Sequence, residues 1–270
     1  MTIGLDPVIA RLGPFELGWH GILTLLAVVV GVWLGQRYAA RAGLPPERTA
    51  DVVIAAVVGG IVGARLFHVL DHLPYYAAHP LEALAIWEGG IAVYGAFLGG
   101  IAAGLVAARR AAVPIWLGLD AAAVPMLVAQ AIGRLGCLSN GDAWGAPTGA
   151  GWGIVYVNAN ALLPRELLGV PTHPYPLYEI AAVLLLAFAL TAYAHRRPPE
   201  GALFLWAALG YGAIRFALSF VRQEPVIVAG LQEAQLVALA TAALAAVLLV
   251  RRAASGTLRR APGARPAPAR

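Results

Sequence analysis

The chain has 270 residues, of which 60% are hydrophobic and only 12% are charged. A soluble globular protein carries about 25% charged residues, so this composition excludes a soluble domain, a disordered chain and, with one cysteine, a disulfide-stabilised fold. The formal net charge is +5, but the arginines are dispersed between apolar segments, so we expect no nucleic-acid partner. We predict an all-α integral membrane protein.

Seven segments are apolar enough to be predicted as membrane-spanning helices, each of which needs about 20 residues. In chain order they are Leu17–Leu34, Val52–Leu70, Gly89–Ala108, Ile115–Ile132, Tyr178–Ala194, Ala202–Val221 and Leu236–Val250. Asp120 and Pro125 weaken the fourth span, and the last span is expected to begin near Leu231. We expect a single membrane domain over residues 1–252, followed by a disordered tail, residues 253–270.

The arginines predict the orientation of these spans. Thirteen of the 19 arginines lie in the tail and in the connections that follow the first, third and fifth predicted spans. Arg11 and Arg165 lie in the loops on the opposite side. The positive-inside rule then places the N-terminus outside and the C-terminus in the cytoplasm. The long connection, residues 133–177, is expected outside the membrane as a small extracytoplasmic head. The N-terminal segment lacks the features of a cleavable signal peptide.

Four arginines lie within or at the ends of predicted spans: Arg65, Arg134, Arg215 and Arg222. A charge at the centre of a bilayer costs about 2.5–3.5 kcal/mol on insertion scales, so such residues need a reason to be there. Guanidinium groups bind phosphate in a planar, bidentate manner, which favours a site for a phospholipid headgroup. The alternative is that these arginines pair with acidic residues and lock the helices together. The candidate acidic partners are Glu88, Asp142 and Glu179.

Other motifs favour structural interpretations. Small-residue pairs such as Gly59/Gly63 and Gly95/Gly99 are typical of closely packed membrane helices. His68 and His72 have a spacing that could bind metal, but no further ligand pattern accompanies them, so we predict no metal site. Cys137 lies near Arg134, which would favour a nucleophilic thiol, although a small apolar filler is the more common role for a lone cysteine.

Residues 133–145, Gly-Arg-Leu-Gly-Cys-Leu-Ser-Asn-Gly-Asp-Ala-Trp-Gly, resemble the signature of the prolipoprotein diacylglyceryl transferase family, Gly-Arg-x-Gly-Asn-x-x-Asn-x-Glu-x-x-Gly. Shorter matches to this family follow in the expected order along residues 15–250. They are Trp19-His20-Gly21, Gly63-Ala64-Arg65, Trp87-Glu88-Gly89-Gly90 with Tyr94-Gly95, His173-Pro174-Tyr175-Pro176-Leu177-Tyr178-Glu179, and Arg215-Phe216 with Arg222.

The resemblance implies a multi-pass enzyme of the bacterial cytoplasmic membrane that uses no cofactor. Its reaction would transfer a diacylglyceryl group from phosphatidylglycerol to the lipobox cysteine of a prolipoprotein, with release of glycerol phosphate. The implied catalytic residues are Arg134, Arg215, His20, Tyr94 and Asp142. The residues implied in headgroup binding and site shape are Arg65, Cys137, Asn140, Gly145, Glu179 and Arg222.

The chain departs from the family pattern at six positions. Cys137 replaces Asn, His20 replaces Tyr, Tyr94 replaces His, Asp142 replaces Glu, Pro176 replaces Gln, and Ser219 replaces an acidic residue. We hypothesise that His20 and Tyr94 exchange proton-handling groups between two helices. The general base is not identified by the sequence.

Three other functions remain open from the residues alone. The protein could be a related phospholipid-dependent transferase with another acceptor, or a non-catalytic homologue that binds or translocates lipid. A transporter for a soluble anion is disfavoured, because the chain shows no internal repeat.

Overall fold

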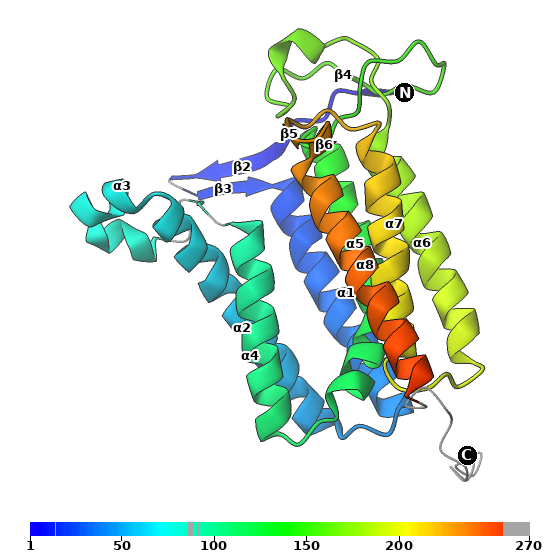
Figure 1. The fold of residues 1–270 in the computed structure, drawn as a ribbon. Coiled ribbons are helices and arrows are strands. Elements are labelled where there is room, and N and C mark those ends of the chain that lie inside the picture. The colour runs from blue at the N-terminus through cyan, green and yellow to red at the C-terminus, as the bar shows by residue number, and fades with distance from the viewer. Residues whose placement is uncertain (14, 86–88, 91, 256–270) are drawn as a thin grey trace.

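The computed structural model describes residues 1–13, 15–85, 89–90 and 92–255. Within this part of the chain, six helices are long and apolar enough to cross a membrane (Figure 1). They are α1 (Trp19–Arg41), α2 (Pro46–Asp71), α5 (Ile115–Asn140), α6 (Tyr175–Ala194), α7 (Ala202–Ser219) and α8 (Glu233–Ala254). Helix α4 (Val93–Arg110) has 18 residues and ends in two arginines. The prediction of a multi-pass helical membrane protein is confirmed. Of the predicted tail, residues 253–270, Ala253 and Ala254 are the last residues of α8, and the part from residue 256 onward lies outside the described residues.

The long helices alternate in direction along the chain (Figure 1). Residues 141–174 form a structure above one end of the helices. We call this structure the head, and that end of the helices the head end. The N-terminal residues lie at the head end, and the described chain finishes at the opposite end, where the connections 42–45, 111–114 and 195–201 also lie.

Helix α5 is the central helix of the main apolar core. Val124 and Leu127 of α5 pack with Val183 of α6 and Leu203 of α7, all of them buried. Although α5 contains Pro125, it continues to Asn140, so residues 133–140 are helical and the connection to α6 is shorter than predicted. The helix ends at Gly141, whose φ of 73° is a left-handed conformation that glycine adopts without strain.

Helices α2 and α4 approach each other through glycines. A Cβ atom on Gly63 would collide with the Gly95 carbonyl oxygen, and a Cβ on Gly95 would collide with the Gly63 carbonyl. Gly99 is blocked in the same way by the Gly59 carbonyl. The predicted packing role of these glycines is therefore confirmed.

Asp120, a charged residue within the fourth predicted span, has a structural role. Its carboxylate is buried, and it accepts hydrogen bonds from the backbone N–H groups of Gly201 at 2.6 Å and Phe204 at 2.9 Å. These N–H groups belong to the start of α7, where helical N–H groups lack partners within the helix. Asp120 thus caps α7 from a neighbouring helix.

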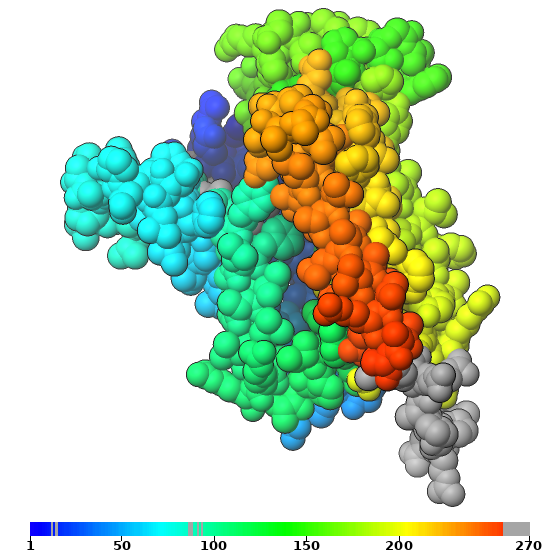
Figure 2. Space-filling model, in the orientation of Figure 1, coloured from blue at the N-terminus to red at the C-terminus, as the bar shows by residue number. Residues whose placement is uncertain are grey.

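Three two-stranded β-ladders lie at the head end. β1 (Thr2–Ile3) pairs in parallel with β4 (Val155–Tyr156), β2 (Val8–Leu12) pairs with β3 (Phe15–Gly18), and β5 (Val226–Val228) pairs with β6 (Leu231–Gln232). A small apolar cluster that includes Ile3, Ile154 and Leu163 stabilises the head, together with the 3-10 helix η3 (Arg165–Leu167). The short helices α3 (Leu73–Ala78) and η1 (Pro80–Leu84) project sideways from the end of α2 (Figure 2).

Candidate active site

Three of the four predicted arginines gather at the head end of α5, α6 and α7. Arg134, Arg215 and Arg222 are each mostly buried, with 13–19% of the side chain exposed. They surround Tyr175 and two acidic residues, Glu179 and Glu224. We call these six residues the arginine cluster.

Arg134 is held by a fully buried carboxylate. Its Nε lies 2.9 Å from Oε2 of Glu179, which has no exposed surface. Oε1 of Glu179 accepts hydrogen bonds from Gln130 Nε2 at 2.8 Å and from the Tyr211 hydroxyl at 3.3 Å. This fixes one edge of the guanidinium, while Nη1 points to Cys137 Sγ at 3.5 Å.

Arg215 and Arg222 share Glu224. Oε1 of Glu224 lies 3.3 Å from Arg215 Nη2 and 2.9 Å from Arg222 Nε. Both guanidiniums also face the ring of Tyr175, at 5.6 and 5.2 Å from its centroid, and Arg215 donates a hydrogen bond to the Tyr175 hydroxyl. The sequence offered no sign of Glu224 or of Tyr175 as partners, because neither is close to both arginines along the chain.

The alternative interpretation, in which the arginines pair with acidic residues, is therefore confirmed in part. Glu179 pairs with Arg134 as considered, and Glu224 pairs with the other two arginines. Three guanidiniums nevertheless face two carboxylates, so the arginine cluster keeps an excess positive charge. A partly buried site with excess positive charge and several guanidinium N–H donors is suited to a phosphate group.

Arg65 lies in a different setting from the arginine cluster. Its guanidinium donates hydrogen bonds to the carbonyls of Glu82, Ala83, Gly89 and Gly90 at 2.5–2.9 Å. These contacts bind η1 and the residues Gly89 and Gly90 to α2. The structure records no contact between Arg65 and the described residues of the arginine cluster.

His20, Cys137 and Asp142 form a second group beside Arg134. His20 Nδ1 lies 3.5 Å from Asp142 Oδ2, and one possible ligand atom from each of the three residues lies within 4.8 Å of the others. Gly136 permits this approach, since a Cβ there would lie 3.2 Å from His20 Nδ1. Asn140 donates a hydrogen bond to Asp142 Oδ2 at 3.4 Å. We call His20, Cys137 and Asp142 the mixed-donor cluster.

Tyr156 of the head supports the end of α5. Its hydroxyl donates a hydrogen bond to the Leu138 carbonyl at 2.9 Å. Burial, with a contribution from the Asp142 carboxylate, raises the pKa of Tyr156 above its ordinary value. The phenol therefore stays protonated and keeps its donor role over the physiological pH range.

Gly145 joins the head to the arginine cluster. It forms a β-bridge with Arg222, and a Cβ on Gly145 would lie 2.7 Å from the His173 carbonyl oxygen. Only glycine allows this close approach. Ser219, which replaces an acidic family residue, is fully buried, and its hydroxyl donates to the Arg215 carbonyl at 2.8 Å.

Tyr94 occupies a separate position on α4. It is 43% exposed and interacts electrostatically with Glu233, Glu224 and Arg215. The structure records no contact between Tyr94 and His20 in the described residues. Trp87 and Glu88 of the matching Gly-Gly element lie outside those residues.

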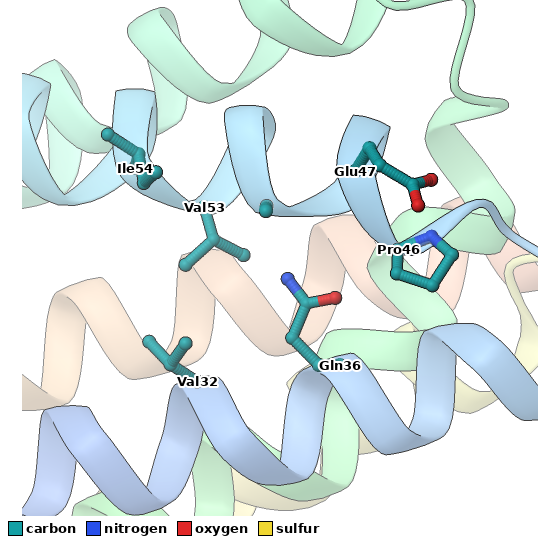
Figure 3. Close-up of a pocket in the computed structure, with 7 residues that line it drawn as sticks. Val32, Gln36, Pro46, Glu47, Val53 and Ile54 are labelled. Carbon is teal, nitrogen blue, oxygen red and sulfur yellow. The ribbon is translucent and has the colours of Figure 1, made fainter.

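An apolar groove of about 540 Å³ lies between α1 and α2, toward the end opposite the head. Val32 and Gln36 of α1 face Val53 and Ile54 of α2 across it, with Pro46 and Glu47 at one side (Figure 3). Its lining contains none of the predicted site residues.

The sequence is similar to known proteins over nearly its whole length. Residues 7–251 match the family described as prolipoprotein diacylglyceryl transferase. The chain is 36% identical to the phosphatidylglycerol–prolipoprotein diacylglyceryl transferase of Symbiobacterium thermophilum, over 91% of this chain and 92% of the relative. It is 37% identical to the protein of the same name from Gloeobacter violaceus, over 89% of this chain and 90% of the relative.

Proposed function

The chain belongs to the prolipoprotein diacylglyceryl transferase family, and from this membership we propose that it transfers the diacylglyceryl group of phosphatidylglycerol to a prolipoprotein. The acceptor is the thiol of the lipobox cysteine. Sulfur attacks the glyceryl carbon next to the phosphate, an S–C bond forms, and the C–O bond to the phosphate breaks. Glycerol phosphate leaves with the bonding electron pair, and the thiol proton is released.

The arginine cluster is the observation that carries this proposal. The bond that breaks leaves negative charge on a phosphate oxygen, and guanidinium donors placed in advance stabilise that charge as it develops. Arg134 and Arg215 act as the catalytic clamp and Arg222 assists them, while Glu179 and Glu224 orient their N–H groups. Gly145 and Asn140 shape the site. Arg65 supports it indirectly, by holding η1 and the glycines that follow it.

His20, Cys137 and Asp142 form the acceptor side. They lie next to Arg134, so a thiol that enters beside them faces the phosphate-bearing carbon of a lipid held by the arginine cluster. Tyr94, in the first turn of α4, is assigned a proton-handling role on the lipid side.

The head end faces the extracytoplasmic side of the bacterial cytoplasmic membrane, and α4 is the seventh span. Support comes from the arginines that end α1, α4 and α8 at the opposite end, as the positive-inside rule requires of a cytoplasmic face. The arginine cluster then lies at the depth of outer-leaflet headgroups.

A reconstituted transfer assay tests the function. The purified protein is mixed with phosphatidylglycerol and a lipobox-containing signal peptide, and mass spectrometry measures the diacylglyceryl adduct on the peptide thiol. We expect an adduct with the wild type and a loss of about 100-fold or more in Arg215→Ala, the range seen when one stabilising donor is removed. Arg11→Ala is the matched control, because Arg11 makes only an exposed ion pair with Glu16. Lipid binding without any adduct would contradict the proposal.

A further inference from the structure

The mixed-donor cluster offers three kinds of metal-binding atom at one point of the head end. His20 lies in the first turn of α1, Cys137 in the last turn of α5, and Asp142 just after that helix. An imidazole nitrogen, a sulfur and a carboxylate oxygen all lie within 4.8 Å of one another. Because His20 comes from α1 and the other two residues from the end of α5, the fold itself brings these atoms together.

Two of these side chains carry buried polar atoms that lack hydrogen bonds. His20 Nδ1 and Asp142 Oδ1 are shielded from solvent and have no hydrogen-bond partner among the described residues. Leaving such atoms unpaired costs free energy. A cation that accepts electron pairs from both would satisfy them.

We propose that His20, Cys137 and Asp142 bind a divalent metal ion, with Zn²⁺ as the ion that best fits the donors. Zn²⁺ takes imidazole, thiolate and carboxylate ligands in tetrahedral sites, and three protein ligands leave a fourth position open. Ligand atoms around such an ion are roughly 3–4 Å apart, given metal–ligand bonds of about 2.0–2.3 Å. His20 Nδ1 and Asp142 Oδ2, at 3.5 Å, already have this spacing. The sequence had predicted no metal, from His68 and His72 alone.

The surroundings provide the support that metal ligands need. Arg134 Nη1 donates a hydrogen bond to Cys137 Sγ at 3.5 Å, and Asn140 donates one to Asp142. Partners of this kind orient metal ligands and tune their basicity. All three ligand positions are also departures from the family pattern, which has Tyr, Asn and Glu there. Each substitution introduces or retains a side chain that binds zinc.

The metal would also activate the acceptor thiol, and this role rests on the proposed function. The open position accepts the lipobox thiol, which loses its proton to solvent when it coordinates the metal. The bound thiolate sulfur then attacks the glyceryl carbon. The electron pair of the broken C–O bond leaves on the phosphate oxygen at the arginine cluster, and no oxidant or reductant is needed.

Cobalt substitution tests the metal site without reference to activity. The full chain, purified in detergent and stripped of metal, is titrated with Co²⁺. We expect about one equivalent to bind with a near-ultraviolet thiolate-to-cobalt band, which Zn²⁺ displaces. Cys137→Asn should lose the band and keep its melting temperature, because Asn is the family residue there. The double variant His68→Ala/His72→Ala should keep the band. Absence of the band in the wild type, or its persistence in Cys137→Asn, would overturn the proposal.

A second arm separates the metal role from the function. Removal of metal by a chelator should slow transfer by at least about tenfold, with recovery on addition of Zn²⁺. Transfer that is indifferent to metal removal overturns the thiol-activating role and leaves the proposed function standing. Cobalt binding without transfer at any metal loading contradicts the proposed function instead.

Discussion

At the scale of single residues, Arg134 connects the two halves of the site. Its guanidinium reaches Glu179 through one edge and Cys137 through another, so it lies between the proposed lipid side and the proposed acceptor side. Both contacts depend on a planar group with several fixed N–H donors. Charge alone would not be enough to preserve them.

Replacement of Arg134 by lysine therefore separates charge from geometry. In Arg134→Lys, Glu179 keeps a positive partner together with Gln130 and Tyr211, so we expect the melting temperature to fall little. The transfer rate should drop by about 10–100-fold, because a single ammonium cannot hold both sides. The adduct assay measures this, with the exposed Arg165→Lys as control. A wild-type rate in Arg134→Lys would show that charge is sufficient.

His20 and Tyr94 provide a second test at this scale. A His20 that binds the proposed metal does not also transfer a proton, so the exchange of proton-handling roles is the alternative to metal binding. Under the exchange, each of His20→Ala and Tyr94→Ala should lower turnover, by roughly 10²-fold or more for a lost acid–base group. The same adduct assay measures both variants, and His79→Ala serves as an exposed control. Unchanged turnover in both variants would contradict the hypothesis that His20 and Tyr94 exchange proton-handling roles.

The sequence predicted which arginines gather better than it predicted their partners. An arginine in an apolar span stands out because the membrane makes it costly, and Arg134, Arg215 and Arg222 do meet. Glu224 and Tyr175 were missed, since an acidic residue in a loop and an aromatic residue at a helix end are ordinary in sequence. Arg65 was expected beside the others, but its partners are backbone carbonyls, which no side-chain pattern reveals.

At the scale of elements, the pairing of α2 and α4 depends on backbone contact. Gly63→Ala places a methyl group against the Gly95 carbonyl, and the strain should lower the free energy of unfolding by about 1–3 kcal/mol. Gly35→Ala on α1 has open space around it and should leave stability unchanged or raise it by up to about 1 kcal/mol. Thermal unfolding in detergent measures both, and equal melting temperatures would contradict the close approach.

The cap that Asp120 provides for α7 gives another prediction. Asp120→Ala leaves the N–H groups of Gly201 and Phe204 without their acceptor, which should cost about 1–2 kcal/mol of stability. Asp51→Ala, at an exposed carboxylate on α2, should change little. The melting temperatures of the two variants decide between a cap and a tolerated defect. From hydrophobicity alone, Asp120 weakened the prediction of a membrane span. Its role as a hydrogen-bond acceptor for a neighbouring helix cannot be seen in the sequence of one segment.

At the scale of the whole molecule, the proposed orientation can be tested with one thiol at a time. Gly149 lies exposed in the head and Ala42 lies exposed at the opposite end. In a Cys137→Asn background, Gly149→Cys should react with a membrane-impermeant maleimide in intact bacteria, whereas Ala42→Cys should react only after permeabilisation. The reverse pattern would invert the orientation.

Composition and hydropathy were sufficient for the membrane class and for the location of the long helices. They were less informative about the ends, because the last turns of α5 carry the polar residues Arg134, Ser139 and Asn140, and the predicted span therefore stopped eight residues short of Asn140. The ladder of β1 with β4 could not be predicted, since it joins segments about 150 residues apart through two residues each.

The contact of Gly63 with Gly95 has a consequence for how this family can accumulate mutations. When two side chains clash, a second substitution that shrinks one of them can restore the fit. Here the obstacle on each helix is the carbonyl oxygen of the other, which no codon change can make smaller. A selection for suppressors of Gly63→Ala should therefore recover true revertants or changes that move a whole helix, and none at the facing glycine.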